Sequence, residues 1–207
     1  MMYVVNQMIS SLLQLAIVLL LALVLKAIFQ KNRRPYLEWI GLKKTAIDYK
    51  AILLISVSYL LIALLPVGWL YQGGQMNNAD ALTVKAYLAN GLDVQTLLVI
   101  LLWAVIQTSL TEEILFRGSL LNTFRQFTSP QKANVAQALL FSLMHLPALK
   151  NYGLLPMAVI GLMTFPIAYA LGWLVINRSH FSIINTWIIH ASVNLISQIG
   201  ILLFYIK

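Results

Sequence analysis

Long runs of uncharged residues dominate the hydrophobic pattern of the chain. Four of them cover residues 1–25, 51–79, 94–111 and 151–177. About 20 such residues in an α-helix are enough to cross a hydrocarbon layer of roughly 30 Å. These runs and the apolar segments between them predict six helices, over residues 3–29, 51–71, 95–124, 132–148, 154–176 and 182–206. The pattern is typical of an all-α, polytopic transmembrane helix bundle.

Residues that interrupt helices support these limits. Gly73 and Gly74 follow the second predicted helix, and Ser129 and Pro130 separate the third helix from the fourth. Pro147 is expected to close the fourth helix, which is the short one. Small side chains let helices approach closely. Such residues recur along the fifth helix, at Gly161, Ala168 and Gly172.

Composition places the chain in a membrane. Of its 207 residues, 60% are apolar and only 10% are charged, which is far from the make-up of a soluble domain. We expect one integral membrane domain, residues 1–207, with two helices in 1–94 and a core in 95–206. The first run has no basic residue before it and no cleavage pattern before Lys26, so we interpret it as a retained helix. The absence of cysteine excludes disulfides and cysteine-ligated zinc.

The net charge of +8 is carried by the short connections between the apolar runs. Basic flanks of this kind are retained in the cytoplasm, so the charge is interpreted as topogenic and no nucleic-acid partner is expected. Most basic residues fall near residues 35, 128 and 179, whereas the opposite side holds Lys85, Lys150 and Lys207. We therefore expect these three connections in the cytoplasm, both termini outside, and an external loop over 72–90.

Two adjacent carboxylates lie in the third predicted helix, Glu112 and Glu113, although the chain has only six acidic residues. A charge inside the bilayer costs about 2.5–3.5 kcal/mol even on permissive scales, so such a pair predicts a functional site. Arg117 follows Glu113 by four residues and can form an ion pair on the same helix face. Glu112 points about 100° away and stays available for chemistry. The alternative is that the pair lies at the interface, where water solvates it.

Two histidines fall in other predicted helices. His145 lies in the fourth helix and His190 in the sixth, with Phe141 and Asn194 four residues away on their faces. A single membrane histidine usually bonds one helix to another, whereas two histidines with a glutamate pair favour chemistry. With a rise of about 1.5 Å per residue, their depths overlap with that of Glu112, which predicts one cavity open to the cytoplasm. Candidates for its polar wall are Gln107, Thr108, Ser109 and Thr111.

Over about residues 95–200 the sequence resembles the CAAX-protease and bacteriocin-processing family of membrane endopeptidases, also called the Abi family. The three signatures of that family, E-E-x-x-x-R, F-x-x-x-H and H-x-x-x-N, are present in order on separate apolar helices. They stand here as Glu112, Glu113 and Arg117, as Phe141 and His145, and as His190 and Asn194. No position departs from the three patterns.

The resemblance implies proteolysis inside a membrane cavity. Glu112 and His145 would activate water, and His190 and Asn194 would stabilise the oxyanion. The substrate would be a peptide or protein at the membrane, lipidated or not, and the protein would lie in a bacterial plasma membrane. The supporting residues that hold the frame would be Glu113, Arg117 and Phe141.

Three alternatives stay open from the sequence. Glu112, His145 and His190 offer the ligands of a catalytic zinc site, although the chain has no H-E-x-x-H helix and Asn194 is a poor zinc ligand. A non-enzymatic protein that confers bacteriocin immunity or modulates a membrane sensor is the second, but it has no need of carboxylates and histidines in apolar helices. A proton-coupled transporter is the third, disfavoured by the lack of an internal repeat.

Overall fold

The computed structural model describes residues 1–30, 34–73, 81–146 and 153–205, and within these ranges every regular element is helical. The long helices are α1 (Met2–Phe29), α3 (Tyr49–Gln72), α7 (Pro130–His145), α8 (Leu154–Asn177), α9 (Ile184–Tyr205) and a continuous helix over Val94–Phe124. Of the helices in the described ranges, five are long and apolar enough to cross a membrane, and α7, with 16 residues, is the long helix outside that group. The predicted all-α bundle is confirmed.

The observed helix ends agree with the predicted ones to within three residues. Two short helices were not predicted: α2 (Tyr36–Trp39), and α4 (Leu82–Asn90) in the segment expected as an external loop. Helix α4 forms because Val84 packs with Ile100 and Leu202 in a buried cluster. The helices were predicted from long uncharged runs, and the nine residues of α4 are too few to form such a run. The predicted stop at Pro147 lies outside the described residues.

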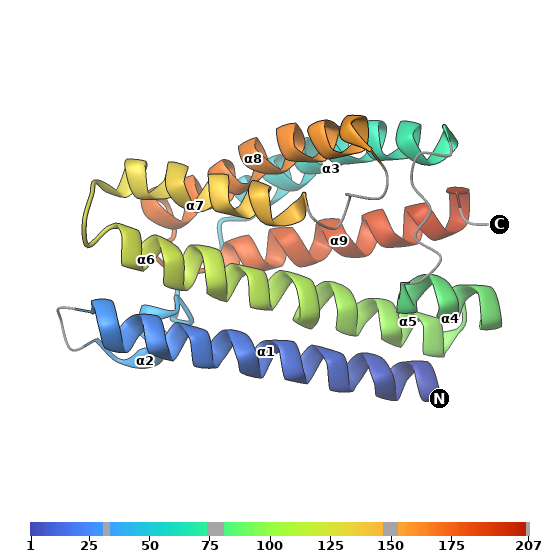
Figure 1. Ribbon diagram of the computed structural model, residues 1–207, viewed down its shortest axis with the longest axis horizontal. Helices are drawn as coiled ribbons and strands as arrows, with labels where there is room; N and C mark the ends of the chain where they lie inside the picture. The colour runs from blue at the N-terminus through green and yellow to red at the C-terminus, as the bar shows by residue number, and fades with distance from the viewer. Residues whose placement is uncertain (31–33, 74–80, 147–152, 206–207) are drawn as a thin grey trace.

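The helix Val94–Phe124 is central to the bundle. Helix α1 packs along one side of it and α9 along the other, α3 packs against α9, and α7 packs against α8 (Figure 1). Figure 1 also shows both ends of the chain at one end of the bundle, with α2 and the turn between α6 and α7 at the other. The central helix therefore presents its residues to α1, α7 and α9 at once.

Side-chain caps fix where two of these helices begin. Asp93 accepts a hydrogen bond of 2.8 Å from the backbone N–H of Thr96, which caps the central helix. Ser129 caps α7 by accepting from the N–H of Lys132, and Pro130 occupies the first helical position, where its missing N–H costs nothing. The cap at Ser129 corresponds to the break that the sequence predicted between the third and fourth helices.

Wide turns interrupt the α-helical geometry of the central helix. It runs as α5 (Val94–Leu101), the π-helix η1 (Leu102–Leu110), the π-helix η2 (Glu113–Leu120) and α6 (Leu121–Phe124). The hydroxyls of Thr108 and Ser119 each donate to a carbonyl five residues earlier, the spacing of a π-turn. Turns of this kind are rare and are frequent at functional sites. Glu112 lies at the junction of the two wide segments.

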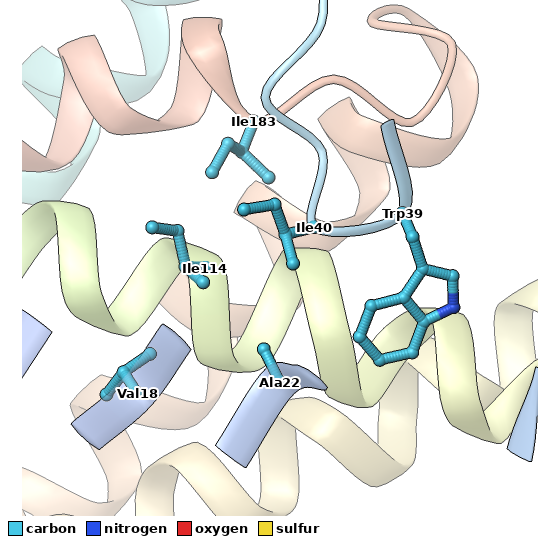
Figure 2. Close-up of a cluster of buried hydrophobic side chains, with 6 residues drawn as sticks. All are labelled: Val18, Ala22, Trp39, Ile40, Ile114 and Ile183. Carbon is cyan, nitrogen blue, oxygen red and sulfur yellow. The ribbon is translucent and has the colours of Figure 1, made fainter. Parts of the chain in front are cut away.

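A buried apolar cluster holds the α2 segment against the central helix. It consists of Val18, Ala22, Trp39, Ile40, Ile114 and Ile183 (Figure 2). The backbone of Ile40 passes so close to Gly118 that a Cβ there would lie 2.2 Å from the Ile40 carbonyl oxygen. Gly41 then turns the chain with φ +81° and accepts a hydrogen bond from the N–H of Ile183, just before α9. This cluster therefore joins the start of α9 to the helix that carries the glutamates.

Gly118→Ala is expected to destabilise the protein by about 1–3 kcal/mol, because the new methyl group meets a backbone atom that cannot move away alone. The unfolding temperature of the purified variant in detergent checks this. Gly200→Ala is the matched control, since a Cβ at Gly200 in α9 meets nothing within 4 Å. The control should unfold at the wild-type temperature or slightly above it, and equal melting of Gly118→Ala and wild type would contradict the packing argument.

Small residues on α8 allow α7 to approach, as the sequence predicted. A Cβ at Gly172 would lie 1.8 Å from the side-chain oxygen of Asn134. The carbonyl of Ala168 accepts a hydrogen bond of 3.1 Å from the Gln137 amide, and that of Gly161 accepts one of 2.9 Å from Ser142. Polar side chains of α7 thus bond directly to the α8 backbone. These bonds fix the rotation of α7 about its axis, and with it the position of Phe141.

Candidate active site

Glu113 is the buried centre of a charged network. Its Oε1 lies 3.1 Å from Nη1 of Arg117 and 3.0 Å from Nδ1 of His190, and its side chain is fully buried. The ion pair with Arg117 is the one expected from the four-residue spacing. Because a carboxylate can only accept, the Nδ1 of His190 donates to it. Glu113 therefore fixes the ring orientation of a histidine from a different helix.

His190 bridges the two glutamates. With Nδ1 directed to Glu113, its Nε2 faces Glu112, whose Oε2 lies 3.7 Å away. The Glu112 side chain is 23% exposed, whereas that of Glu113 is 0% exposed. The two adjacent glutamates therefore have different surroundings. Arg117 and His190 enclose the carboxylate of Glu113, whereas the side chain of Glu112 faces a pocket.

Phe141 connects the first motif with the second. Its ring lies 4.5 Å from the guanidinium carbon of Arg117 and 4.5 Å, between centroids, from the ring of His145. It also meets Phe116 edge to face at 4.9 Å. A cation over an aromatic face is attracted by the ring quadrupole, and the contact is strengthened where water is excluded. The aromatic ring at this position therefore orients both Arg117 and His145.

His145 is the last residue of α7 and lies at the wall of two pockets. Its Nδ1 is 2.7 Å from the carbonyl oxygen of Phe141, so Nδ1 carries the hydrogen and Nε2 is left as an acceptor. One pocket, of about 350 Å³, is lined by Glu112 and His145 together with residues of α1, including Gln14. Helix α7 therefore brings His145 to the pocket that the partly exposed Glu112 also lines.

Asn194 is held by hydroxyl groups of the central helix. Its Nδ2 donates to Oγ1 of Thr108 at 2.9 Å and to Oγ of Ser109 at 3.2 Å. Thr108 uses its own hydrogen on the carbonyls of the preceding turn, at 3.0 and 3.2 Å, so it can only accept from the amide. Thr108 therefore bonds its own helix and also holds Asn194 of α9.

The second pocket, of about 200 Å³, lies on the other side of His145 and is mainly apolar. Asn194 and Tyr59 also line it. Tyr59 comes from α3, with its ring 6.3 Å from that of His190 between centroids. Sequence reasoning missed this residue, although a tyrosine in the middle of an apolar helix is a signal that could have identified it.

Helix α1 also contributes to the site, which the sequence motifs did not indicate. The amide of Gln14 donates to the carbonyl of Gln107 at 2.9 Å and to the hydroxyl of Thr111 at 3.2 Å. Gln107 in turn bonds to Gln7 and donates to Ser10 at 2.9 Å. The polar stripe on α1, at helical spacing in an otherwise apolar run, is the signal that could have identified this wall.

The residues considered as zinc ligands do not form a set that fits a metal ion. Within the described parts of the chain, no group of three or more His, Cys, Asp or Glu side chains has the geometry to hold one. His190 directs Nδ1 to Glu113 and Nε2 toward Glu112, and the Nδ1 of His145 is bonded to its own helix.

Comparison with known families and proteins gives one match. The family model described as type II CAAX prenyl endopeptidase Rce1-like matches residues 94–196, about half of the chain. No curated protein and no solved structure matches significantly. The matched segment contains both glutamates, Arg117, both histidines of the network and Asn194. The chain therefore belongs to the Rce1-like family of type II CAAX prenyl endopeptidases.

Proposed function

We propose that this protein is an intramembrane endopeptidase that hydrolyses peptide bonds of membrane-associated substrates. The observation that supports it best is the His190 bridge, in which one imidazole contacts the enclosed Glu113 and faces the exposed Glu112. A protein that only binds a partner has no need of glutamates and histidines in apolar helices, because each charge placed there costs free energy. The family match supports the same class of reaction.

In the proposed reaction, Glu112 takes a proton from a water molecule in the pocket that it shares with His145. The free Nε2 of His145 accepts the second hydrogen of that water and so orients it. The water oxygen attacks the peptide carbonyl, and the proton held by Glu112 passes to the leaving amine. The bond that forms is C–O and the bond that breaks is C–N, so no further reactant is required.

His190 supplies the positive charge for the oxyanion. Glu113, behind the ring, accepts from Nδ1 and stabilises the imidazolium, so Nε2 can donate to the oxygen that becomes negative. Asn194 is the second proposed donor. Its amide nitrogen already donates to the hydroxyls of Thr108 and Ser109. One of these bonds must therefore be replaced by a bond to the substrate oxygen, and the bond to Ser109 is the longer of the two.

The pocket is proposed to open toward the cytoplasm. The segment that follows α2 and the turn before α9 lie together, because Arg178 pairs with Asp48 at 2.9 Å and Ser182 donates to the carbonyl of Lys43 at 2.8 Å. These basic connections therefore share one end of the bundle, and basic flanks are retained inside the cell. A multi-pass protein of a bacterial plasma membrane fits this distribution. Processing of bacteriocin-like peptides is the biological role that we propose from the motifs.

Cleavage of peptides by the protein in proteoliposomes tests the proposal. Peptides with CAAX-type ends and unmodified apolar peptides are incubated with the reconstituted protein, and products are identified by mass spectrometry. We expect new termini at defined bonds with the wild type and none with His145→Ala. Protection of cells against a bacteriocin by an inactive variant, with no peptide cleaved by the wild type, would instead support the binding alternative.

The same assay settles metal dependence. Because the two histidines and Glu112 do not form a ligand set that fits a metal, we expect cleavage to continue at its original rate after dialysis against a strong chelator. Metal content of the dialysed protein is measured in parallel. Loss of activity that zinc alone restores would contradict the water-activation scheme and favour a metallopeptidase.

A further inference from the structure

A second polar pocket lies at the loop end of the bundle, away from the glutamates. It has a volume of about 110 Å³ and is lined by Gln30, Arg34, Trp39, Asn122, Arg125 and Gln126. The pocket lies between the end of α1, the α2 segment and the end of α6, where the predicted cytoplasmic connection begins. At about 30 Å³ of liquid per water molecule, it has room for a small polyatomic ion.

The pocket contains buried donors that have no acceptor. Within the described parts of the chain, the indole Nε1 of Trp39, a residue only 2% exposed, has no hydrogen-bond partner, and neither does Nε2 of Gln30. Figure 2 shows the Trp39 nitrogen turned away from the apolar cluster in which the rest of the ring is packed. Buried donors are nearly always paired in native proteins, so unpaired ones facing a polar pocket indicate a missing acceptor.

The two guanidinium groups of the pocket lack an acidic partner among the described residues. Arg125 lies over the ring of Phe181, 3.7 Å from its centroid, and donates to the side-chain oxygen of Asn122 at 3.2 Å. Burial lowers the pKa of Arg125 below its usual range, and the charge of Arg34 lowers it further. An arginine in such surroundings remains protonated, so its positive charge is left uncompensated.

The neighbouring amide of Asn122 cannot supply the missing acceptor. Its oxygen accepts from Arg125, and its nitrogen donates to the carbonyl of Trp39 at 2.6 Å. Gln126 donates to the Asn122 backbone carbonyl at 3.2 Å. The amide of Asn122 thus braces Arg125 against the α2 segment.

We propose that this pocket binds a phosphate-type oxyanion, either a lipid phosphate at the inner surface of the membrane or inorganic phosphate. Guanidinium groups match phosphate oxygens with paired, charge-assisted hydrogen bonds, and an indole N–H and an amide N–H add neutral donors. Basic pockets at the cytoplasmic ends of membrane helices lie at the level of lipid headgroups, where anionic lipids gather. The bound anion fixes the α1–α2 connection against α6. This binding site is independent of the proposed peptidase activity.

Thermal unfolding of the purified full chain distinguishes the sources of the anion. One series adds inorganic phosphate in neutral detergent, with sodium chloride at equal ionic strength as its reference. The other compares nanodiscs of phosphatidylglycerol with nanodiscs of phosphatidylcholine. A ligand at ten times its Kd should raise the unfolding temperature by about 3–6 °C. A rise in the first series assigns free phosphate, and a rise in the second alone assigns the phosphate of an anionic lipid, because the choline group of phosphatidylcholine neutralises its own phosphate.

Two variants and a control make the result specific. Arg125→Gln should abolish the rise or weaken apparent affinity at least about tenfold. Trp39→Phe, which keeps a smaller aromatic ring and removes the N–H, should weaken it less. Lys132→Gln, an exposed residue at the same end, changes the net charge equally and should respond as the wild type does. No rise in either series, or an equal response from Arg125→Gln and Lys132→Gln, would overturn the proposal.

Discussion

Glu112→Gln is expected to lower the rate of peptide cleavage by about 10²–10⁴-fold, the usual contribution of a positioned general base. The amide keeps the size of the side chain but cannot take a proton from water. Because Glu112 is 23% exposed and faces His190 only at 3.7 Å, its replacement leaves the Glu113–Arg117 pair in place. The variant should therefore fold and insert like the wild type. Initial rates in proteoliposomes, measured at equal protein incorporation, check the prediction.

Glu38→Gln serves as the control for this change. Glu38 is an exposed residue of α2, so the same removal of charge should leave the cleavage rate unaltered. Retained cleavage by Glu112→Gln at a rate within about threefold of the wild type would be incompatible with a role for Glu112 as the base. A loss in both variants would point to the net charge of the surface and away from the site.

Arg117→Met should cause the largest loss of stability among single replacements. Arg117 is 1% exposed and pairs with Glu113 at 3.1 Å, so its removal leaves a fully buried carboxylate without its guanidinium partner. Breaking a buried pair by deleting one partner costs about 3–5 kcal/mol. In a chain of this size, that corresponds to a fall in unfolding temperature of about 6–20 °C. Thermal unfolding in detergent measures it.

Two further variants separate this effect from a general loss of charge. The double variant Glu113→Gln with Arg117→Met has no uncompensated charge and should unfold at a higher temperature than Arg117→Met. Arg178→Met removes one partner of an exposed pair, since the Arg178 side chain is 55% exposed, and should cost only about 0–1 kcal/mol. Additive losses in the double variant would show that Glu113 and Arg117 do not stabilise each other.

The spacing of charged residues was enough to predict the core of the network. Glu113 and Arg117 pair because residues four apart share a helix face, and this held although the turns there are π-helical. The contact of His190 with Glu113 joins residues 77 positions apart, so only the estimated helix depths and the family resemblance brought the two motifs together. The sequence offers no local rule that would place one helix beside another.

Other parts of the site depend on packing that leaves little trace in the sequence. Thr108 and Ser109 both hold Asn194 of α9, although an α-helix separates adjacent residues by about 100° and the sequence gives no sign that one amide reaches both hydroxyls. The need for glycine at position 118 arises from the Ile40 backbone, which lies against it and is distant in the sequence. Tyr59 enters the second pocket only because α3 packs on α9.

Cleavage in water enriched with ¹⁸O tests most directly the claim that Glu112 directs hydrolysis at this site. The wild type and Glu112→Gln are reconstituted in parallel, and the peptide products are analysed by mass spectrometry. The account predicts one ¹⁸O atom in the new terminal carboxylate of the wild-type product and no product above background from the variant. Peptide that is bound but uncut by the wild type, or labelled product formed equally by both proteins, would contradict it.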